Sequence, residues 1–295
     1  MYALMGANGH IASKAAALLL SRGQKVRALG RDGARLKPLQ DAGAEIAIGD
    51  ALDSRFLAEA FSGAAGVFAL IPPNYTAPDA RAFQSRIGAS IADGLAQAGV
   101  PRVVNLSSVG GGLAAGTGPI AGLHEQEERL NRIPGLDLLH LRPAYFFENH
   151  FGAIPAIKAL GVFPGMLRAD VPFAQIDTRD IAAAVADELV RPGRFARPVR
   201  HLLGPRDLSM NDVASILGKA AGKPDLRYVQ APAAEAKKSL VQMGISPSLA
   251  DLFEEMCAAL GDGRIARTVT RDADSTTPTR LEDFAPAFGA AFNSA

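Results

Sequence analysis

The chain has 295 residues, of which 48% are hydrophobic and 21% are charged, a balance typical of a globular protein rather than a disordered one. A net charge of +1 gives no reason to expect nucleic acid or an acidic membrane surface as a partner. The single cysteine, Cys257, excludes an intramolecular disulfide and a thiolate cluster. The five histidines are too dispersed to form a metal-ligand pair on one helix, so we expect no metal site.

No apolar run approaches the ~20 residues that a membrane-spanning helix needs. The apolar stretch from Ala15 to Leu20 is preceded by Gly6, Asn8 and Gly9 and by no basic segment, so we expect no signal peptide. These observations predict a soluble, cytoplasmic protein without a membrane partner, either a monomer or a homodimer.

In the first half of the chain, short apolar runs alternate with longer helical patterns. We predict strands at Tyr2–Met5, Lys25–Leu29, Glu45–Ile48, Gly66–Ile71, Arg102–Leu106 and Asp137–Arg142. Helices are predicted between them at Ile11–Arg22, Asp32–Ala42, Asp53–Phe61, Ala80–Ala98 and Gly122–Arg132. This alternation, with short glycine-bounded turns, predicts an α/β fold in which a Rossmann-type, doubly wound parallel sheet carries helices on both faces.

After Pro143 the pattern changes, because prolines interrupt the elements and strand signals become sparse. We predict amphipathic helices at Asp180–Val190, Asn211–Ala221 and Ser248–Leu260. Residues 1–150 are therefore expected to form the Rossmann domain, and residues 151–295 a smaller, helix-rich lobe that covers its cleft. The boundary is soft, since part of the second segment can return a strand to the main sheet.

A glycine-rich turn links the first predicted strand to the first helix. Gly6 permits a tight turn, Gly9 lets the backbone approach a pyrophosphate, and the small Ala12 keeps the helix close to the strand. The first N–H groups of the helix and the positive end of its dipole then face the phosphates. A purely structural turn is the alternative, but the βα repeats that follow favour a dinucleotide. We expect cofactor contacts from Gly6, Asn8, Gly9, His10 and Ile11.

The end of the second strand bears on the choice of nicotinamide cofactor. An NAD site usually has an acidic residue there, whereas this chain has Gly30 followed by Arg31, whose guanidinium suits a 2′-phosphate. Asp32 complicates the assignment, because a shift of two residues would restore an acid, and Arg31 is alternatively a solvated loop arginine. The pattern favours NADP(H), with NAD(H) as the other possibility.

Further candidate residues follow the third, fourth and fifth strands, where ligands of open α/β sheets bind. Asp50 ends the third strand, where its carboxylate can accept from an adenine amino group, although an exposed turn aspartate is an equal interpretation. We expect additional cofactor contacts from Ala51, Ile71, Pro72, Pro73, Ser107 and Ser108.

These motifs together resemble the NmrA-like branch of the atypical short-chain dehydrogenases. The resemblance rests on the Gly6–Ala12 turn, Gly30-Arg31, Gly49-Asp50, Ile71–Pro73, Ser107-Ser108, His124–Glu127, Leu141–Pro143, Phe147–Asn149, Ile176–Ile181, Gly204-Pro205 and Leu208-Ser209. It covers residues 2 to 230, and the segment from Arg142 to Asn149 is its most specific part. It implies NADP(H) as the usual cofactor and a small C-terminal lobe that forms the substrate pocket.

The family includes quinone, azo-dye and triphenylmethane reductases, and also cofactor-sensing regulators with little or no catalysis. Ordinary short-chain dehydrogenases use a tyrosine with a lysine four residues later, and no tyrosine here is followed by such a lysine. There is also no lysine between Asn105 and Asn149, where isoflavone-reductase-like relatives have theirs, and His124 stands in that neighbourhood instead. An alcohol dehydrogenase mechanism is therefore disfavoured.

The resemblance implies hydride transfer to a small conjugated acceptor, which needs little proton assistance. His124 is expected either to donate a proton or hydrogen bond, or to contact the cofactor ribose or cap a helix. Tyr145 is the second catalytic candidate, and the alternative function is an NADP(H)-sensing regulator. Glu127 is expected to orient local structure, and Asn149 to hold its loop. The expected substrate-pocket residues, some of which are alternatively core residues, are Tyr75, Tyr145, Phe146, Phe147 and Asn149.

Overall fold

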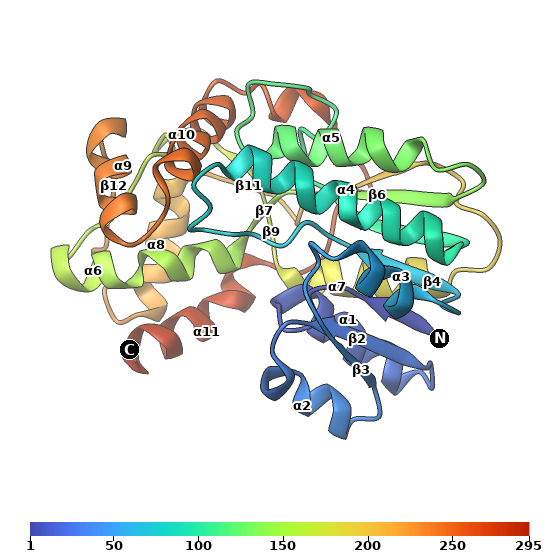
Figure 1. The fold of residues 1–295 in the computed structure, drawn as a ribbon. Helices are drawn as coiled ribbons and strands as arrows, with labels where there is room; N and C mark the ends of the chain where they lie inside the picture. The colour runs from blue at the N-terminus through green and yellow to red at the C-terminus, as the bar shows by residue number, and fades with distance from the viewer. Residues whose placement is uncertain (295) are drawn as a thin grey trace.

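A computed structural model describes residues 1–294, and its centre is a seven-stranded sheet (Figure 1). The strands run in the order β10-β6-β5-β4-β1-β2-β3, and every neighbouring pair is parallel. Their bounds are β1 Tyr2–Leu4, β2 Val26–Gly30, β3 Glu45–Ile48, β4 Gly66–Ala69, β5 Arg102–Leu106, β6 Asp137–Pro143 and β10 Val199–Leu202. The order reverses between β1 and β4, which creates the crevice where ligands of doubly wound sheets bind.

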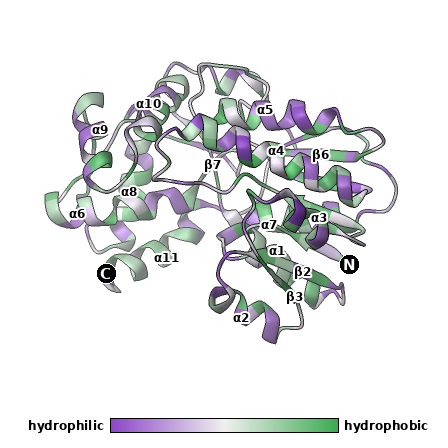
Figure 2. Ribbon diagram, in the orientation of Figure 1, coloured by the Kyte–Doolittle hydropathy of each residue, from purple (hydrophilic) through white to green (hydrophobic). Residues whose placement is uncertain are grey.

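Helices cover both faces of this sheet, because each buries an apolar stripe against it. One face carries α1 (His10–Ser21), α2 (Gly33–Asp41) and α7 (Thr178–Val190), and Figure 1 shows α7 beside α1. The other face carries α3 (Ser54–Phe61), α4 (Ala80–Ala98) and α5 (Ile120–Asn131). In Figure 2 hydrophilic and hydrophobic residues alternate along α4 and α5, as the amphipathic pattern requires. The predicted Rossmann-type fold is confirmed.

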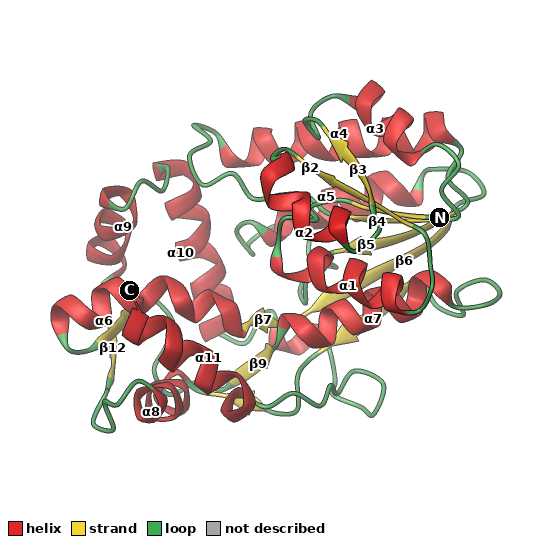
Figure 3. Cartoon of the chain, turned by 90° about the horizontal axis from the view of Figure 1, so that it is seen from below, coloured by secondary structure: helices red, strands yellow, loops and turns green. Residues whose placement is uncertain are grey.

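A second apolar core is formed by residues that follow β6 in the chain. It lies in a group of helices that Figure 3 shows at one side of the sheet. Its helices are α6 (Ile154–Leu160), α8 (Met210–Ala220), α9 (Ala233–Gln242), α10 (Pro247–Gly261) and α11 (Leu281–Ser294), with 3₁₀ turns at Phe147–Ala153 and Ala266–Thr268. Its short strands are β7 (Tyr145–Phe146), β8 (Phe163–Gly165), β9 (Phe173–Ile176), β11 (Asp207–Leu208) and β12 (Tyr228–Gln230). Strands β11, β9 and β7 form one small sheet, and β12 pairs with β8.

The chain crosses between the two groups more than once. After forming β7 and α6 it returns α7 to the main sheet and adds β10 beside β6, with Val199 opposite His140. The division at residue 150 stays a prediction; α7 and β10 follow it in the chain but pack on the main sheet. No helix among residues 1–294 is both long and apolar enough to cross a membrane.

Candidate cofactor and substrate site

The start of α1 is shaped to receive an anion. Gly6 has φ = +66°, which glycine adopts without strain, and Gly9 donates its N–H to the Gly6 carbonyl at 2.8 Å to close the turn. Gly9 is the N-cap of α1, and no side chain accepts from the N–H groups of the first turn. By contrast, aspartates cap α2, α3, α4 and α7 through their carboxylates. The first turn of α1 therefore keeps N–H groups for a ligand, as a pyrophosphate site requires.

Asn8 connects this turn to the end of β2. Its Nδ2 donates to the Asp32 carbonyl at 3.2 Å, and its Oδ1 is buried without a hydrogen-bond partner. A Cβ atom at Gly30 would lie 2.2 Å from that Oδ1, so only glycine allows Asn8 to lie across the strand end. The orphaned oxygen and the uncapped helix both fit a polar cofactor in this turn.

Two arginines lie at the end of β2, although only Arg31 was expected there from the sequence. Arg31 is exposed, and the guanidinium of Arg35 donates from Nη2 to the Asn8 carbonyl at 3.2 Å. The Asp32 carboxylate accepts from the backbone N–H groups of Ala34 and Arg35 at 2.9 and 3.3 Å, so it caps α2. Asp32, the acid that complicated the choice between NADP(H) and NAD(H), therefore has a structural role as the cap of α2. The sequence feature that could have identified Arg35 is its position in the first turn of the helix that Asp32 caps.

The ends of β3 and β4 complete the edge of the crevice. Asp50 accepts from the Leu52 N–H at 2.9 Å, which closes its own turn, and Ala51 next to it is half-buried. Ile48 and Leu52 are exposed there, at 59% and 42%, so an apolar surface is open beside Asp50. After β4, Ile71 and Pro72 are half-buried and Pro73 is exposed.

The loop after β4 then reaches the second group of helices. The Tyr75 carbonyl accepts from the Ser246 N–H at 2.8 Å, and the Ser248 hydroxyl accepts from the Ala80 N–H at 3.1 Å. Both contacts join the loop to the start of α10. The Tyr75 side chain itself is 51% exposed.

Buried polar side chains meet at the ends of β5 and β6. Ser107 donates its hydroxyl hydrogen to Glu127 Oε1, and Arg142 binds the same carboxylate through Nε to Oε1 at 2.9 Å and Nη2 to Oε2 at 2.5 Å. Ser107 and Glu127 are each 3% exposed. Ser108, by contrast, directs its hydroxyl to the Val109 carbonyl at 3.0 Å. We call Ser107, Glu127 and Arg142 the carboxylate cluster.

His124 lies one helical turn before Glu127 and is half-buried. Its Nδ1 is 2.9 Å from the Gly111 carbonyl, which can only accept, so Nδ1 carries the hydrogen. In the neutral ring Nε2 is then an acceptor, and His124 donates from Nε2 only when the ring is protonated. A Cβ atom at Gly111 would lie 2.6 Å from Ser107 Oγ and 2.7 Å from Glu127 Oε1, so the carboxylate cluster requires glycine there.

The aromatic residues after β6 have different surroundings. Tyr145 pairs with Gln175 across β7 and β9 and makes a side-chain hydrogen bond to Asn149. Burial raises the pKa of Tyr145 above its ordinary value of 10, and the nearby Cys257 adds to this effect. Phe146 is half-buried against the main core. Phe147 is fully buried in the second core, with its ring centroid 5.7 Å from that of Phe284, so it packs behind the other two.

Two further polar side chains of this segment have partners inside the protein. His150 donates from Nε2 to Gln175 Oε1 at 2.9 Å, because Gln175 gives its own Nε2 hydrogen to the Leu208 carbonyl at 3.1 Å. Burial lowers the pKa of His150 to about 4, so the ring is neutral. Glu148 accepts from the Thr178 hydroxyl and from Lys14 Nζ at 3.5 Å, which ties α1 to α7.

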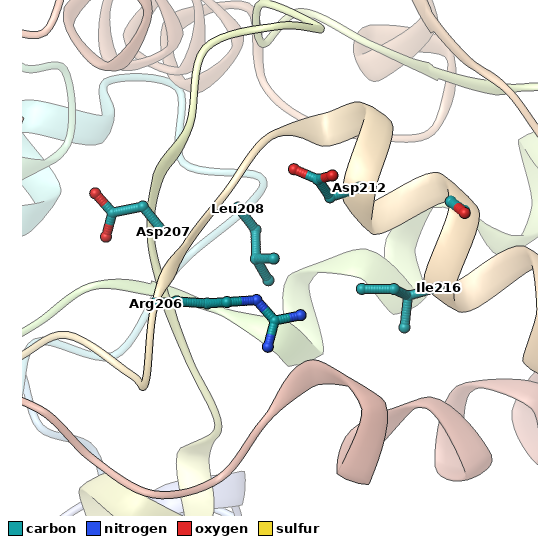
Figure 4. Close-up of a pocket in the computed structure, with 6 residues that line it drawn as sticks. Arg206, Asp207, Leu208, Asp212 and Ile216 are labelled. Carbon is teal, nitrogen blue, oxygen red and sulfur yellow. The ribbon is translucent and has the colours of Figure 1, made fainter.

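A surface hollow of about 200 Å³ lies away from these residues, at the start of α8 (Figure 4). Arg206, one of its charged residues, pairs with Glu282 at 2.6 Å. No residue of the predicted site lines this hollow, whose lining residues are Arg206, Asp207, Leu208, Asp212, Ser215 and Ile216.

Two protein-family models match this chain. A model of an NAD(P)H-binding family matches residues 6–192, and the model of the NmrA-like family matches residues 137–285. The chain belongs to the NmrA-like family. The predicted resemblance is confirmed, and so is membership of an NAD(P)H-binding family.

Two curated relatives and two solved structures illustrate the similarity. The NAD(P)H azoreductase of Xenophilus azovorans is 32% identical over 302 residues, covering 100% of both chains. The (4-alkanoyl-5-oxo-2,5-dihydrofuran-3-yl)methyl phosphate reductase of Streptomyces griseus is 28% identical over 253 residues, covering 86% of this chain and 84% of its own. An NADPH-dependent quinone oxidoreductase of Escherichia coli, complexed with NADPH, superposes with a TM-score of 0.80 at 20% identity, covering 97% and 99% of the two chains. The triphenylmethane reductase of Citrobacter sp., complexed with NADP(H), has a TM-score of 0.77 at 19% identity, covering 98% and 100%.

Proposed function

We propose that this NmrA-like protein is an NADPH-dependent reductase that transfers hydride to a small conjugated acceptor such as an azo dye or a quinone. The observation that carries the proposal is that the uncapped start of α1, Arg31 with Arg35, and His124 all lie near the carboxyl ends of the parallel strands. Full-length similarity to an azoreductase supports the acceptor class.

The binding end of the site would hold the cofactor phosphates. The free N–H groups at the start of α1 suit the pyrophosphate, and Arg31 and Arg35 suit a 2′-phosphate, which favours NADPH over NADH. Asp50, Ala51 and the apolar Ile48 and Leu52 would border the adenine. The cofactor supplies the hydride, and Ile71–Pro73 and Ser107 would border its reactive end.

The acceptor end of the site has His124 as its candidate acid. Tyr145 holds its phenol proton because burial raises its pKa, and His124 donates from Nε2 only as the imidazolium. A conjugated acceptor disperses the incoming charge over its own π-system, so it suits such a site better than a simple ketone does. We propose Tyr75, Tyr145, Phe146 and Asn149 as the pocket, with Phe147 packed behind it.

A cytoplasmic location and a monomeric or homodimeric state belong to the same proposal. The location is supported by the lone cysteine and by the lack of a spanning helix among the described residues. Sedimentation of the purified protein separates the two oligomeric states.

The test is oxidation of NADPH and of NADH, followed at about 340 nm with a panel of quinones and azo dyes. Arg31→Ala should raise the KM for NADPH about 10- to 100-fold, because a hydrogen bond to a charged group contributes roughly 1.5–3 kcal/mol. The KM for NADH should not change. Arg86→Ala, which removes an exposed arginine from α4 on the other face of the sheet, is the matched control.

His124→Asn separates the two interpretations of the histidine. If His124 assists the acceptor, kcat should fall about 100-fold or more while the dissociation constant of NADPH stays the same. If it only contacts the cofactor, NADPH binding should weaken instead. Tight NADPH binding with no turnover on any acceptor would refute the reductase and favour a cofactor sensor.

A further inference from the structure

Three elements place the carboxylate cluster behind the proposed hydride-transfer end of the site. Ser107 directly follows β5, Glu127 lies on α5, and Arg142 lies on β6, the strand next to β5. The side chains of Glu127 and Arg142 are 5% and 16% exposed, so little water competes for their contact. The guanidinium contacts both carboxylate oxygens, which is the bidentate geometry of strong arginine–carboxylate pairs.

This geometry fixes which way the Ser107 hydroxyl points its hydrogen. Both oxygens of Glu127 accept from guanidinium N–H groups, so neither oxygen is placed to donate a hydrogen to Ser107. The Ser107 hydroxyl must therefore donate to Glu127 Oε1. Its single hydrogen is used, and only its lone pairs remain for a ligand.

A glycine links the same cluster to His124. The close approach of Gly111 to Ser107 and Glu127 leaves no room for a side chain, and the Gly111 carbonyl accepts from His124 Nδ1. Displacing the Glu127 carboxylate would therefore disturb both Ser107 and the loop that holds His124.

We propose that Glu127 is a positioning residue that fixes Ser107 as a hydrogen-bond acceptor for an N–H group of the bound cofactor. The N–H donor at the reactive end of a nicotinamide cofactor is its carboxamide NH₂. The inference rests on the proposed use of NADPH. It excludes Ser107 as a hydroxyl donor to a substrate carbonyl, because that hydrogen is committed to Glu127.

The experiment measures cofactor binding, so it does not depend on turnover. Fluorescence or calorimetric titration would compare NADPH with its 3-acetylpyridine analogue, which carries an acetyl group and has no N–H to donate. The unmodified protein should bind NADPH about threefold to tenfold more tightly than the analogue, the effect of one hydrogen bond. Ser107→Ala should remove this preference.

Glu127→Ala should remove or reverse the preference, because it removes the acceptor of the Ser107 hydrogen and leaves that hydrogen free for the acetyl oxygen. Glu128→Ala, which truncates an exposed neighbour on α5, should keep it and is the matched control. If Glu127→Ala does not fold, Glu127→Asp keeps the charge for Arg142 but withdraws the carboxylate from Ser107, and the preference should again fall.

Retention of the NADPH preference in folded Glu127→Ala or Glu127→Asp, or in Ser107→Ala, would overturn the proposal. Equal binding of the two cofactors by the unmodified protein would overturn it as well. Either result leaves the proposed reductase intact, because that proposal is tested by turnover and by Arg31→Ala. Conversely, if the protein shows no turnover, its preference for NADPH over the analogue can still be measured by titration.

Discussion

Acidification should destabilise this protein through His150, whose ring is 2% exposed in the second core. Burial lowers the pKa of His150 from its ordinary 6.5 to about 4, so the unfolded chain binds the proton first as the pH falls. The contribution is complete above about pH 6.5 and is lost progressively down to about pH 4. At roughly 1.4 kcal/mol per pH unit, the free energy of unfolding should drop by about 2 kcal/mol by about pH 5.

The assay is urea unfolding followed by circular dichroism at about pH 7 and about pH 5. His150→Asn keeps a donor toward Gln175 but does not titrate, so its stability should fall by about 2 kcal/mol less than that of the unmodified protein. His140 and His201 also have pKa values lowered by burial, and their effect cancels in this difference. Equal losses of stability in the two proteins would refute the reasoning.

Three other predictions concern packing, capping and reactivity. Gly118→Ala should destabilise the protein by about 3 kcal/mol or more, because φ is +59° and the new Cβ would lie 1.9 Å from the Leu252 carbonyl oxygen. Gly135→Ala, with φ = +76° and no neighbour within 4 Å, should cost only about 1 kcal/mol in the same urea titration. Asp32→Ala should cost about 1 kcal/mol through loss of the α2 cap, and an unchanged preference for NADPH over NADH would separate capping from cofactor binding. Cys257, whose pKa burial raises to about 12, should react with iodoacetamide at least about tenfold more slowly in the folded than in the unfolded protein, and equal rates would contradict its enclosure.

The βα half was predictable because its strands are apolar runs of regular spacing separated by glycine turns. Even so, β4 ends at Ala69 rather than at Ile71, and β6 continues to Pro143. The small strands of the second half gave no such signal. Strand β7 is only two residues long and β8 contains Pro164, so both depend on pairing with distant segments rather than on local propensity.

The candidate site likewise contains residues that a local sequence pattern predicts and residues that it does not. The turn around Gly9 and the arginine after β2 are local patterns, so their positions at strand ends follow from the order of residues alone. Arg35 has only its place in the first turn of α2 as a local signal. The carboxylate cluster depends on contacts between separate elements, which no local pattern encodes. Likewise, three consecutive aromatic residues do not reveal which of them faces inward, and the second core encloses Phe147.

The return of the chain to the main sheet has a consequence for its synthesis. During translation β6 has no outer neighbour until Leu202 has been made, because β10 is the strand that pairs with it. Until α7 arrives, the side of α1 that packs against α7 also stays uncovered. The nascent nucleotide-binding half thus exposes an unpaired strand edge and an apolar helix face, both of which promote association between chains. The sheet that carries the dinucleotide crevice is therefore complete only after most of the polypeptide has been made, including the segment that first builds part of the neighbouring lobe.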